Sequence, residues 1–493
     1  NVLAAEGQSV DGSADKAKSW TLDSFDDTTF ATTKNGTAVE NQLADMDINS
    51  WLPGTATYMT RSDWEGTFPK TYKNLTASDE MLDILDNDIY EINANGDPST
   101  VTFGADNGLT LADLKGVTDL DDERWSLLMD QLTLEEGMIR LGLGGTSTKA
   151  IESIMSPETI QNDGPNGIYS YPLGQYANTD KAGTDPCAVD ANDPNLAYKF
   201  GTMVNETVIA QTFNKDLANE YGKICGNYSL WSNLTIFWGC GTNLHRSPYN
   251  ARNHEYYSED AVLTSGQAVA FISGGKEYGV IIAPKHLAFN DTEINRTGVS
   301  VFMTEQQARE NELRGTQAAI EDAGALGVMT AFNRVGITAT NAHTGLLKNI
   351  LRGEWGFDGA VITDWGGSND HALGVKNGST LEMPAPGGDS VRELLAAVES
   401  GKISESDIDA RLSELLPLVF DTKAALDAAP REFDAEAHHA LARRAAAESL
   451  VLLKNEGSLL PLAAGSKVAV IGDFAKNPVS YTHLRAHETL ANL

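Results

Sequence analysis

The sequence has few cysteines, few basic residues and no long apolar run. Its three cysteines, Cys187, Cys225 and Cys240, form no CxxC pair, so we expect neither a disulfide framework nor a thiolate zinc site. Only 36 Lys and Arg stand against 69 Asp and Glu, a net charge of -33, and this argues against a nucleic-acid partner because phosphate binding needs clustered cations. No stretch approaches the roughly 20 apolar residues of a membrane helix. We therefore expect a soluble protein without a membrane partner, and leave open whether it is cytoplasmic or secreted.

Short apolar runs that alternate with helical segments predict an α/β fold with a parallel sheet. Capping-box patterns at 133–136 and 304–307 mark helix starts. The expected strands lie at 236–239, 280–283, 326–330 and 360–363. Each is followed by polar, potentially reactive residues. Strands that end in such residues, with helices that return the chain, are typical of a TIM-like (β/α)8 barrel, whose active site lies at the carboxyl ends of the strands.

The texture of the chain changes along its 493 residues, which are enough for two or three cores. We expect an irregular leader over 1–120 and the barrel over 121–425. A linker and the start of a second α/β sandwich domain are expected over 426–478, with an amphipathic helix at 435–454 and a buried strand, KVAVIG, at 467–472. The segment 479–493 does not continue the pattern and is expected to be a non-native tail.

The clearest chemical signal is the sequence GAVITDW at 359–365. An apolar strand there delivers Asp364 at its end, with Trp365 beside it. An Asp at the mouth of a barrel can act as a nucleophile if nearby cations keep it ionised. The alternative is that Asp364 caps the next helix, a common role of Asp.

Other strand ends carry further candidates. Lys285 and His286 close the strand that ends in APKH, where they could hold sugar hydroxyls and lower the pKa of a carboxylate. A core histidine is the alternative for His286, but a lysine is rarely buried without a partner. Asp163, in NDGP, can bind a ligand or make an Asx-turn.

The loop at 241–260, GTNLHRSPYNARNHEYYSED, contains Arg246 and Arg252. Arginine forks suit the recognition of polyhydroxylated rings, although a solvated loop is an equally simple interpretation. His245 and His254 lack ligand spacing on one helix face, and the sequence has no HExxH motif. We therefore expect no metal and no cofactor.

Taken together, six motifs in a fixed order resemble glycoside hydrolase family 3 over residues 123–474. They are DGP, HRSPYNARNHEYYSED, PKH, EWGF-GAVITDW, LEMP and AAAESLVLLKNEGSLLPL. The resemblance implies a retaining exo-acting β-glycosidase, with β-glucosidase ranked before β-xylosidase and β-N-acetylglucosaminidase. Its substrate would be a small β-glycoside or oligosaccharide, and the resemblance leaves the sugar and the oligomeric state open.

The same resemblance implies the roles of individual residues. Asp364 would be the nucleophile, and Trp365 would form part of the pocket wall. Phe332 stands where many members carry Tyr. The residues implied or selected as substrate-binding are Asp163, Arg246, Arg252, Lys285, His286, Phe332 and Trp365.

No residue of this chain matches the general acid of the family. In most members that acid is a Glu of the sandwich domain, so we expect a C-terminally truncated chain, with Glu293 and Glu382 as the carboxyl groups to inspect. TRSDWEGTFPK resembles members with a permuted domain order, whereas AAAESLVLLKNEG resembles the usual order. The alternatives are a catalytically impaired sugar-binding fragment and a different barrel enzyme that uses Lys285 as a Schiff base.

Overall fold

The computed structural model describes ten segments of the chain. They are residues 39–56, 74–87, 102–117, 119, 121–143, 147–164, 203–231, 234–384, 389–428 and 434–471. The TRSDWEGTFPK stretch, Cys187 and the predicted tail 479–493 lie outside these residues.

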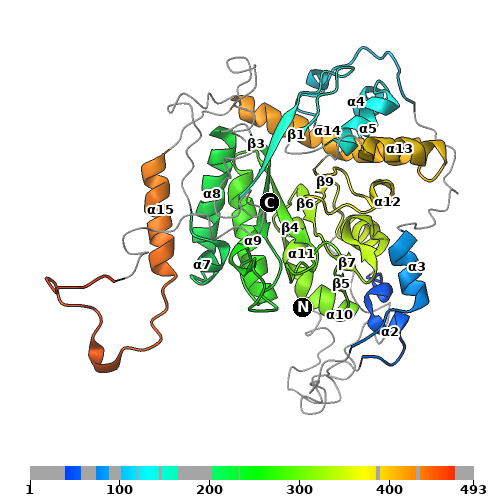
Figure 1. The fold of residues 1–493 in the computed structure, drawn as a ribbon. Coiled ribbons are helices and arrows are strands. Elements are labelled where there is room, and N and C mark those ends of the chain that lie inside the picture. The colour runs from blue at the N-terminus through cyan, green and yellow to red at the C-terminus, as the bar shows by residue number, and fades with distance from the viewer. Residues whose placement is uncertain are drawn as a thin grey trace, which may run out of the picture.

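A curled mixed sheet lies at the centre of the described residues (Figure 1). Its strand order is β1-β2-β3-β4-β6-β9, and all neighbours from β2 to β9 run parallel. The four predicted strands are confirmed as β3, β4, β6 and β9. The strands are β1 (Ser147–Thr148), β2 (Thr159–Asp163), β3 (Leu234–Gly241), β4 (Ile281–Leu287), β6 (Gly327–Thr330) and β9 (Ala360–Ile362).

This sheet is half a barrel, so the closed eight-stranded barrel predicted from the sequence is not formed by the described residues. One edge ends at β1, which runs antiparallel to β2. At the other edge, Ile362 of β9 makes only a single parallel bridge, to Leu381. Closure requires that the two edges of the sheet be joined by further strand pairing, and the described residues show none between β1 and β9.

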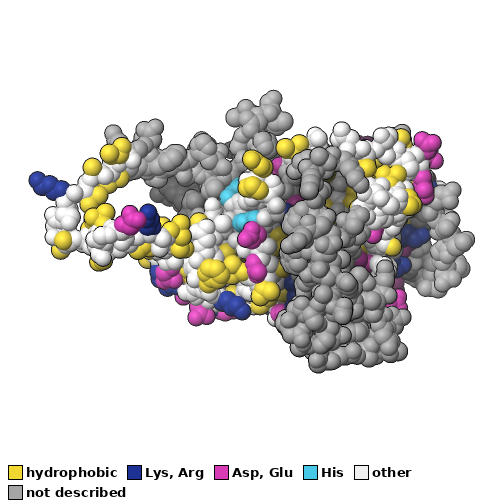
Figure 2. Space-filling view, turned by 90° about the horizontal axis from the view of Figure 1, so that it is seen from below, with side chains coloured by type: hydrophobic (Ala, Val, Ile, Leu, Met, Phe, Trp, Pro, Cys, Tyr) yellow, Lys and Arg dark blue, Asp and Glu magenta, His cyan; other side chains and the backbone are white. Residues whose placement is uncertain are grey.

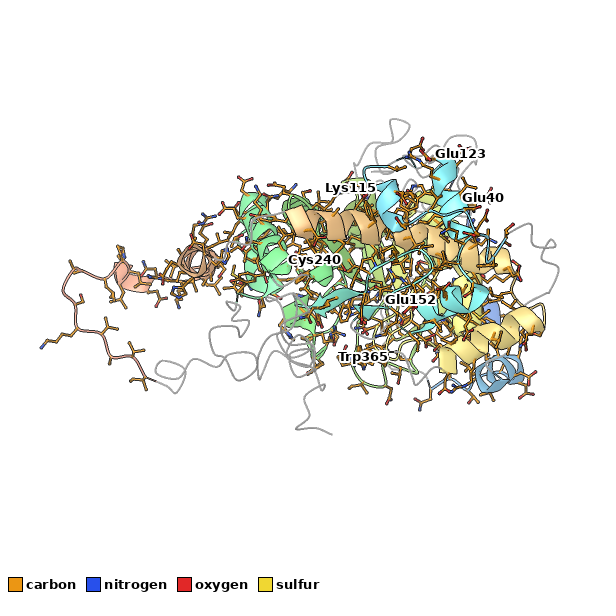
Figure 3. The ribbon with its side chains drawn as sticks, turned by 90° about the horizontal axis from the view of Figure 1, so that it is seen from above. Glu40, Lys115, Glu123, Glu152, Cys240 and Trp365 are labelled. Atoms are coloured by element: carbon orange, nitrogen blue, oxygen red, sulfur yellow. The ribbon has the colours of Figure 1, made fainter. Side chains whose placement is uncertain are left out.

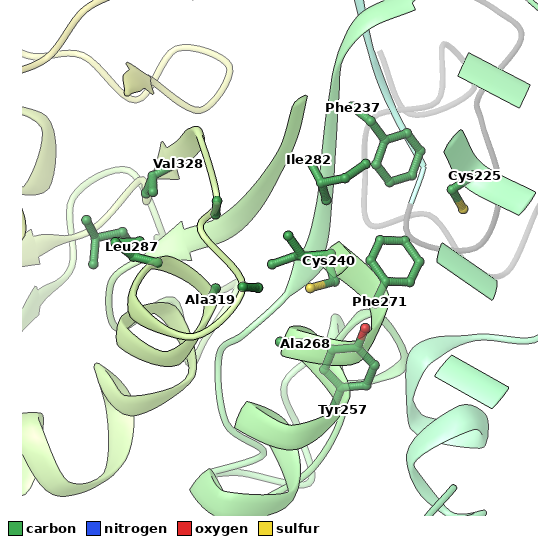
Figure 4. Packing of buried hydrophobic residues seen from close by; sticks show 14 of the residues in the cluster. Cys225, Phe237, Cys240, Tyr257, Ala268, Phe271, Ile282, Leu287, Ala319 and Val328 are labelled. Carbon is green, nitrogen blue, oxygen red and sulfur yellow. The ribbon is translucent and has the colours of Figure 1, made fainter. Parts of the chain in front are cut away.

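The parallel strands are buried on both faces, and their side chains alternate between two cores. On β3, Phe237 packs in the cluster beneath the helices, with Phe271 and Ile282 (Figure 4). Ile236 and Trp238 point to the other face, into the interior of the curled sheet. This alternation with a period of two explains why the strands appear as continuous apolar runs in the sequence.

Helices α8 (Lys215–Trp231), α9 (Ala261–Lys276) and α11 (Arg314–Glu321) cover the outer face of the sheet (Figure 1). A Cβ atom on Gly222 would lie 2.0 Å from the carbonyl oxygen of Phe271, so glycine permits the close approach of α8 to α9.

A second helical core lies beside β9. It is bridged to the sheet by α14 (Glu405–Ala428), whose Leu412 packs among the other helices while Leu415 packs on Ala360 of β9. The other helices of this core are α4 (Glu123–Met129), α5 (Leu134–Gly142), α12 (His371–Asn377) and α13 (Asp389–Glu399).

Smaller elements complete the described structure, and both predicted helix starts are observed: Thr133 caps α5 with the expected capping box, and Thr304 caps α10. The remaining helices are η3 (Ala44–Met46), α2 (Ile48–Trp51), α3 (Asp79–Asn87), η4 (Leu111–Leu114), α7 (Glu206–Ala210), η5 (Asn253–Glu255), α10 (Glu305–Gln307), the π-helices η6 (Ala308–Glu312) and η8 (Gly345–Glu354), η7 (Thr340–Ala342), α15 (Ala435–Glu448) and η9 (Glu456–Ser458). A small second sheet contains β5 (Ser300–Val301), β7 (Arg334–Val335) and β8 (Thr338–Ala339).

Parts of the predicted irregular leader are packed against the body. Leu43 and Met46 are fully buried in the core beneath the outer helices. The backbone N–H groups of Gln42 and Leu43 donate to the carboxylate of Glu305 at 2.7–3.0 Å. Residues 102–117 likewise bury Leu111 and Leu114 in the second helical core.

The C-terminal part of the described chain extends away from the body. The predicted helix is observed as α15, which packs on α7 and α8. After it, residues 450–471 form an extended arm that projects from the molecule with apolar side chains along it (Figures 1 and 2). A buried strand was predicted at 467–472, but the described part of this range, residues 467–471, is exposed and forms no strand. No described strand lies beside it to accept its backbone hydrogen bonds. The second domain therefore stays a prediction. Among the described residues, no helix has the length and apolarity needed to span a membrane.

Candidate active site

Five predicted site residues come together at the carboxyl edge of the sheet. Asp163 ends β2, Lys285 and His286 lie near the end of β4, and Asp364 follows β9 by two residues. Arg252 comes from the loop between β3 and α9. Because neighbouring parallel strands end at the same edge, residues distant in the sequence meet there.

These side chains form an alternating row of charges. The ammonium group of Lys285 lies 2.6 Å from Asp163 Oδ1 and 2.8 Å from Glu255 Oε1. Glu255 Oε2 accepts a 2.6 Å hydrogen bond from Arg252 Nε, and Arg252 Nη1 lies 3.9 Å from Asp364 Oδ2. We call these five residues, Asp163, Lys285, Glu255, Arg252 and Asp364, the charge row.

The charge row keeps its buried carboxyl groups ionised. Burial alone would raise the pKa of Asp364, but His286, Arg252 and Lys285 outweigh it and lower the pKa to about 2. Burial is likewise outweighed at Glu255, where Arg252 and Lys285 hold the pKa well below its usual range. The Asp364 carboxylate is thus an anion with a side chain 11% exposed, as a nucleophile requires. It does not cap a helix: its Oδ1 accepts from the backbone N–H of Trp365 at 2.7 Å, and α12 is capped by Asp370 instead.

His286 lies between the nucleophile candidate and a buried polar cluster. Its Nε2 is 3.0 Å from Arg252 Nη2 and 3.2 Å from Asp364 Oδ2. Its Nδ1 is 3.2 Å from both Tyr256 Oη and Asn243 Oδ1. Burial and the Arg252 guanidinium lower the pKa of His286, although Asp364 opposes them. The ring is therefore neutral at neutral pH.

Sequence reasoning missed Glu255, Tyr256 and Asn243. All three lie in the loop at 241–260, where only the arginines were predicted as site residues. Glu255 follows Arg252 by three residues, a spacing that pairs opposite charges on one helical turn, and this was the available signal.

Arg246 lies outside the charge row. Its guanidinium pairs with Glu312 at 2.9 Å and Asp291 at 3.6 Å, and its side chain is 36% exposed. The two carboxyl groups that it joins are themselves largely buried, and burial together with Glu312 raises the pKa of Asp291 to about 8. The contacts of Arg246 are thus structural in the described residues, and a role in substrate binding stays a prediction.

Asp291 makes stability depend on pH. Its pKa rises from an unfolded value of about 3.9 to about 8 in the folded protein, so the stability that it contributes is complete below pH 4 and is lost as the pH rises through 8. We expect Asp291→Asn to be about 1–4 kcal/mol more stable than the wild type at pH 8.5 and close to it at pH 5. Urea unfolding at the two pH values measures this, and an equal change at both would contradict it.

The last two predicted site residues, Trp365 and Phe332, differ in their exposure. Trp365 is 47% exposed and lies toward the edge of the described side chains, well away from Lys115 and Glu123 (Figure 3). Phe332 is buried, and the guanidinium of Arg296 stacks 3.9 Å from the centre of its ring. Arg296 also binds Glu293 at 2.7 Å, so Phe332 supports the site through this pair.

The two carboxyl groups selected as possible acids differ in orientation. Glu293 Oε1 lies 3.8 Å from Arg252 Nη1, the atom that also faces Asp364. Its Oε2 lies 2.7 Å from Arg296 Nη1, so Glu293 pairs with two arginines. Glu382 lies between Leu381 and Met383, which both point to the sheet interior, so Glu382 points the other way, toward His371 of α12 at 3.7 Å.

Among the residues described, no three His, Cys, Asp or Glu side chains are grouped so that they could hold a metal ion. The two cations of the charge row, Lys285 and Arg252, each pair with one of its carboxylates within 3 Å. The expectation that the protein needs no metal stays a prediction.

Comparison with known proteins places the chain in a family. Residues 196–418 match the N-terminal domain of glycosyl hydrolase family 3. The chain is 34% identical to thermostable beta-glucosidase B of Acetivibrio thermocellus, over 71% of this chain and 45% of the relative. It is 30% identical to an exo-alpha-(1->6)-L-arabinopyranosidase of Bifidobacterium longum, over 70% of this chain and 45% of the relative.

Solved structures agree. The structure of beta-glucosidase 3B from Thermotoga neapolitana in complex with alpha-D-glucose superposes with a TM-score of 0.67 and 29% identity, over 74% of this chain and 52% of that one. The chain thus spans about half the length of the relatives that it matches or less. Through the domain that contains Lys285, His286 and Asp364, the chain belongs to glycosyl hydrolase family 3.

Proposed function

We propose that this chain carries the nucleophile domain of a retaining β-glycosidase, with a β-glucoside as the favoured substrate class. The observation that carries the proposal is the ionised carboxylate of Asp364 at the carboxyl edge of the sheet, 3.2 Å from His286 and 3.9 Å from Arg252. A pKa of about 2 keeps this carboxylate charged at every pH at which such an enzyme works.

In the proposed reaction, the Asp364 carboxylate attacks the anomeric carbon of the terminal sugar. The bond to the leaving oxygen breaks as the bond to Asp364 forms, and an acid protonates the leaving oxygen. Water then attacks the same carbon and gives a proton back to the conjugate base of that acid, which releases the sugar and restores the carboxylate. Asp163, Arg252, Lys285 and His286 would bind the hydroxyl groups of the ring. The names of the relatives, which include beta-glucosidases and an arabinopyranosidase, support an exo-acting enzyme for a terminal pyranose.

Trapping the covalent intermediate tests the proposal. A 2-fluoro glucoside with a good leaving group slows release of the sugar more than its attachment, so we expect one 2-fluoroglucosyl unit per chain. Peptide mass spectrometry should place it on the peptide that contains Asp364. Stoichiometric labelling of any other residue would remove Asp364 from the role of nucleophile.

The second candidate is a sugar-binding domain with impaired catalysis. It is favoured by one observation: of the two carboxyl groups inspected as acids, Glu293 is bound to Arg296 and Glu382 faces away from Asp364. Nitrophenyl glycosides need no protonation of the leaving group, whereas cellobiose does. Turnover of the nitrophenyl glycoside alone would indicate a chain with a nucleophile and no acid, and turnover of neither would indicate a binding domain.

A further inference from the structure

The His286 ring contacts two polar groups at each nitrogen. Some of these groups favour a proton on Nδ1 and others favour a proton on Nε2. At Nε2, Arg252 offers an N–H at 3.0 Å while Asp364 offers a carboxylate oxygen at 3.2 Å. At Nδ1, Asn243 Oδ1 and Tyr256 Oη both lie at 3.2 Å. A neutral imidazole has one N–H and one acceptor nitrogen, so only one of the two arrangements can be satisfied.

The orientation of the Asn243 amide is fixed by the backbone of His286. Its Oδ1 accepts from the backbone N–H of His286 at 2.8 Å, and its Nδ2 donates to the carbonyl oxygen of the same residue at 3.0 Å. The oxygen of Asn243 therefore faces Nδ1. An acceptor in this position stabilises a proton on Nδ1.

The other nitrogen agrees with this assignment. Arg252 has only donors, so its 3.0 Å contact with Nε2 is satisfied when Nε2 accepts. Asp364 opposes this assignment, because a proton on Nε2 would face its Oδ2 at 3.2 Å and lower the pKa of the carboxyl. The contact is nevertheless poorly aligned, and Oδ2 has no hydrogen-bond partner of good geometry among the described residues. A proton on Nδ1 satisfies the contacts with Asn243 Oδ1 and Arg252 Nη2, whereas a proton on Nε2 keeps only the hydrogen bond that the Tyr256 hydroxyl can donate to Nδ1 and the unaligned contact with Asp364. The hydrogen bonds therefore favour the proton on Nδ1.

We propose that Asn243 is a positioning residue that holds His286 with its proton on Nδ1, so that Nε2 anchors the Arg252 guanidinium beside Asp364. With Nη2 bound to the ring and Nε bound to Glu255, the guanidinium cannot rotate. Its remaining nitrogen, Nη1, is buried without a hydrogen-bond partner among the described residues and lies 3.9 Å from Asp364 Oδ2. Asn243 thereby acts on the nucleophile through two other residues.

The charged groups around the ring are consistent with a single proton. Arg252 and Lys285 disfavour the imidazolium ion, Asp364 favours it, and burial gives the neutral form the advantage, so the pKa of His286 is lowered. Glu255 is also near the ring, but its negative charge is offset by its pairs with Lys285 and Arg252. The ring must therefore choose between its two tautomers at neutral pH.

Nitrogen NMR of the full chain labelled with 15N-histidine tests the tautomer directly, with His286→Gln used to assign the signal. We expect the wild type to carry the proton on Nδ1. In Asn243→Leu the proton should move to Nε2, and kcat/KM should fall about ten- to hundredfold because the charged hydrogen bond from Arg252 is lost. In Asn243→Asp the acceptor is kept, so the proton should stay on Nδ1 while the pKa of the ring rises by about one unit or more.

Two control variants separate positioning from folding. Asn333 is also buried and also donates to a backbone carbonyl just beyond β4, that of Ala288, at 3.0 Å, so Asn333→Leu should leave the His286 tautomer unchanged. Tyr256→Phe removes the other neighbour of Nδ1 and should leave it unchanged too. A proton on Nε2 in the wild type, or a tautomer that changes in Tyr256→Phe but not in Asn243→Leu, would overturn the proposal. If neither Asn243 variant folds, the wild-type spectrum alone shows whether the proton lies on Nδ1 or on Nε2.

The inference rests on the proposed function only for its kinetic arm. The tautomer is measured without substrate. A proton on Nδ1 in a chain that labels at no Asp would therefore support the positioning role of Asn243 and contradict the proposed glycosidase function. Labelling at Asp364 in a chain with the proton on Nε2 would do the opposite.

Discussion

Replacing Asp364 with Asn lowers kcat for an activated aryl glucoside by about 10⁴-fold or more, because the variant has no carboxylate to form the covalent bond. The substitution is nearly isosteric, and it removes a charge that Arg252 and His286 contact at 3.9 and 3.2 Å. Steady-state release of nitrophenol measures the effect. Asp291→Asn is the matched control: it also replaces a buried carboxyl group by an amide, but at a position outside the charge row beside Arg246, and it should retain most of the activity.

A small external nucleophile should restore part of the lost rate. Asp364→Ala leaves space where the carboxylate stood, and azide in that space can attack the anomeric carbon from the same side. With a β-aryl glucoside the product is then the α-glucosyl azide, because a single displacement inverts the configuration. A β-azide, or rescue equal in the Asp291→Asn control, would show that Asp364 does not face the anomeric carbon.

Replacing Lys285 with Met destabilises the fold by about 3–5 kcal/mol, since it leaves a buried ion-pair network with one cation removed. The Lys285 side chain is 2% exposed and lies within 2.8 Å of carboxylate oxygens of both Asp163 and Glu255. Without it, these two carboxylates face each other with only Arg252 to compensate. Urea unfolding followed by tryptophan fluorescence at pH 7 measures the loss.

The sensitivity of the Lys285 variant to pH provides a second measurement. The deficit should shrink as the pH falls toward 4, because Glu255 no longer has Lys285 to hold its pKa down, and its protonation removes the uncompensated charge. Lys149→Met is the matched control. Lys149 pairs with Glu158 at 3.2 Å, but both side chains are more than 40% exposed, and such pairs contribute about 1 kcal/mol or less. Equal losses in the two variants would mean that the charge row is not a connected network.

The parallel strands could be predicted because their apolar residues are continuous in the sequence, and β3, β4, β6 and β9 are all found. β2 could not, since TIQND is polar and its burial depends on partners far along the chain. Gln161 accepts from the indole N–H of Trp238 at 3.0 Å, and Thr159 bonds Thr148 at 2.9 Å. The local sequence around β2 does not predict such pairs.

The members of the site were predicted better than their connections. Arg246 and Arg252 lie six residues apart in one polar loop, and nothing local distinguishes them. The structure separates them by partners that come from other segments: Arg252 contacts Asp364, and Arg246 contacts Glu312. The strand predicted at 467–472 is not observed over the described residues 467–471. An apolar run becomes a strand only where other strands accept its hydrogen bonds, and the apolar run alone does not show whether such strands exist.

The alternation of signs along the charge row limits how far its field reaches. Each cation lies within 3 Å of a carboxylate, so the two cations offset two of the three carboxylates and the row keeps a single net negative charge, although the chain as a whole carries -33. At physiological ionic strength, with a Debye length of about 8 Å, dissolved salt screens the outer surface and hardly touches these short contacts. An uncharged ligand entering the site therefore meets a strong local field that changes in the surrounding electrolyte leave nearly constant.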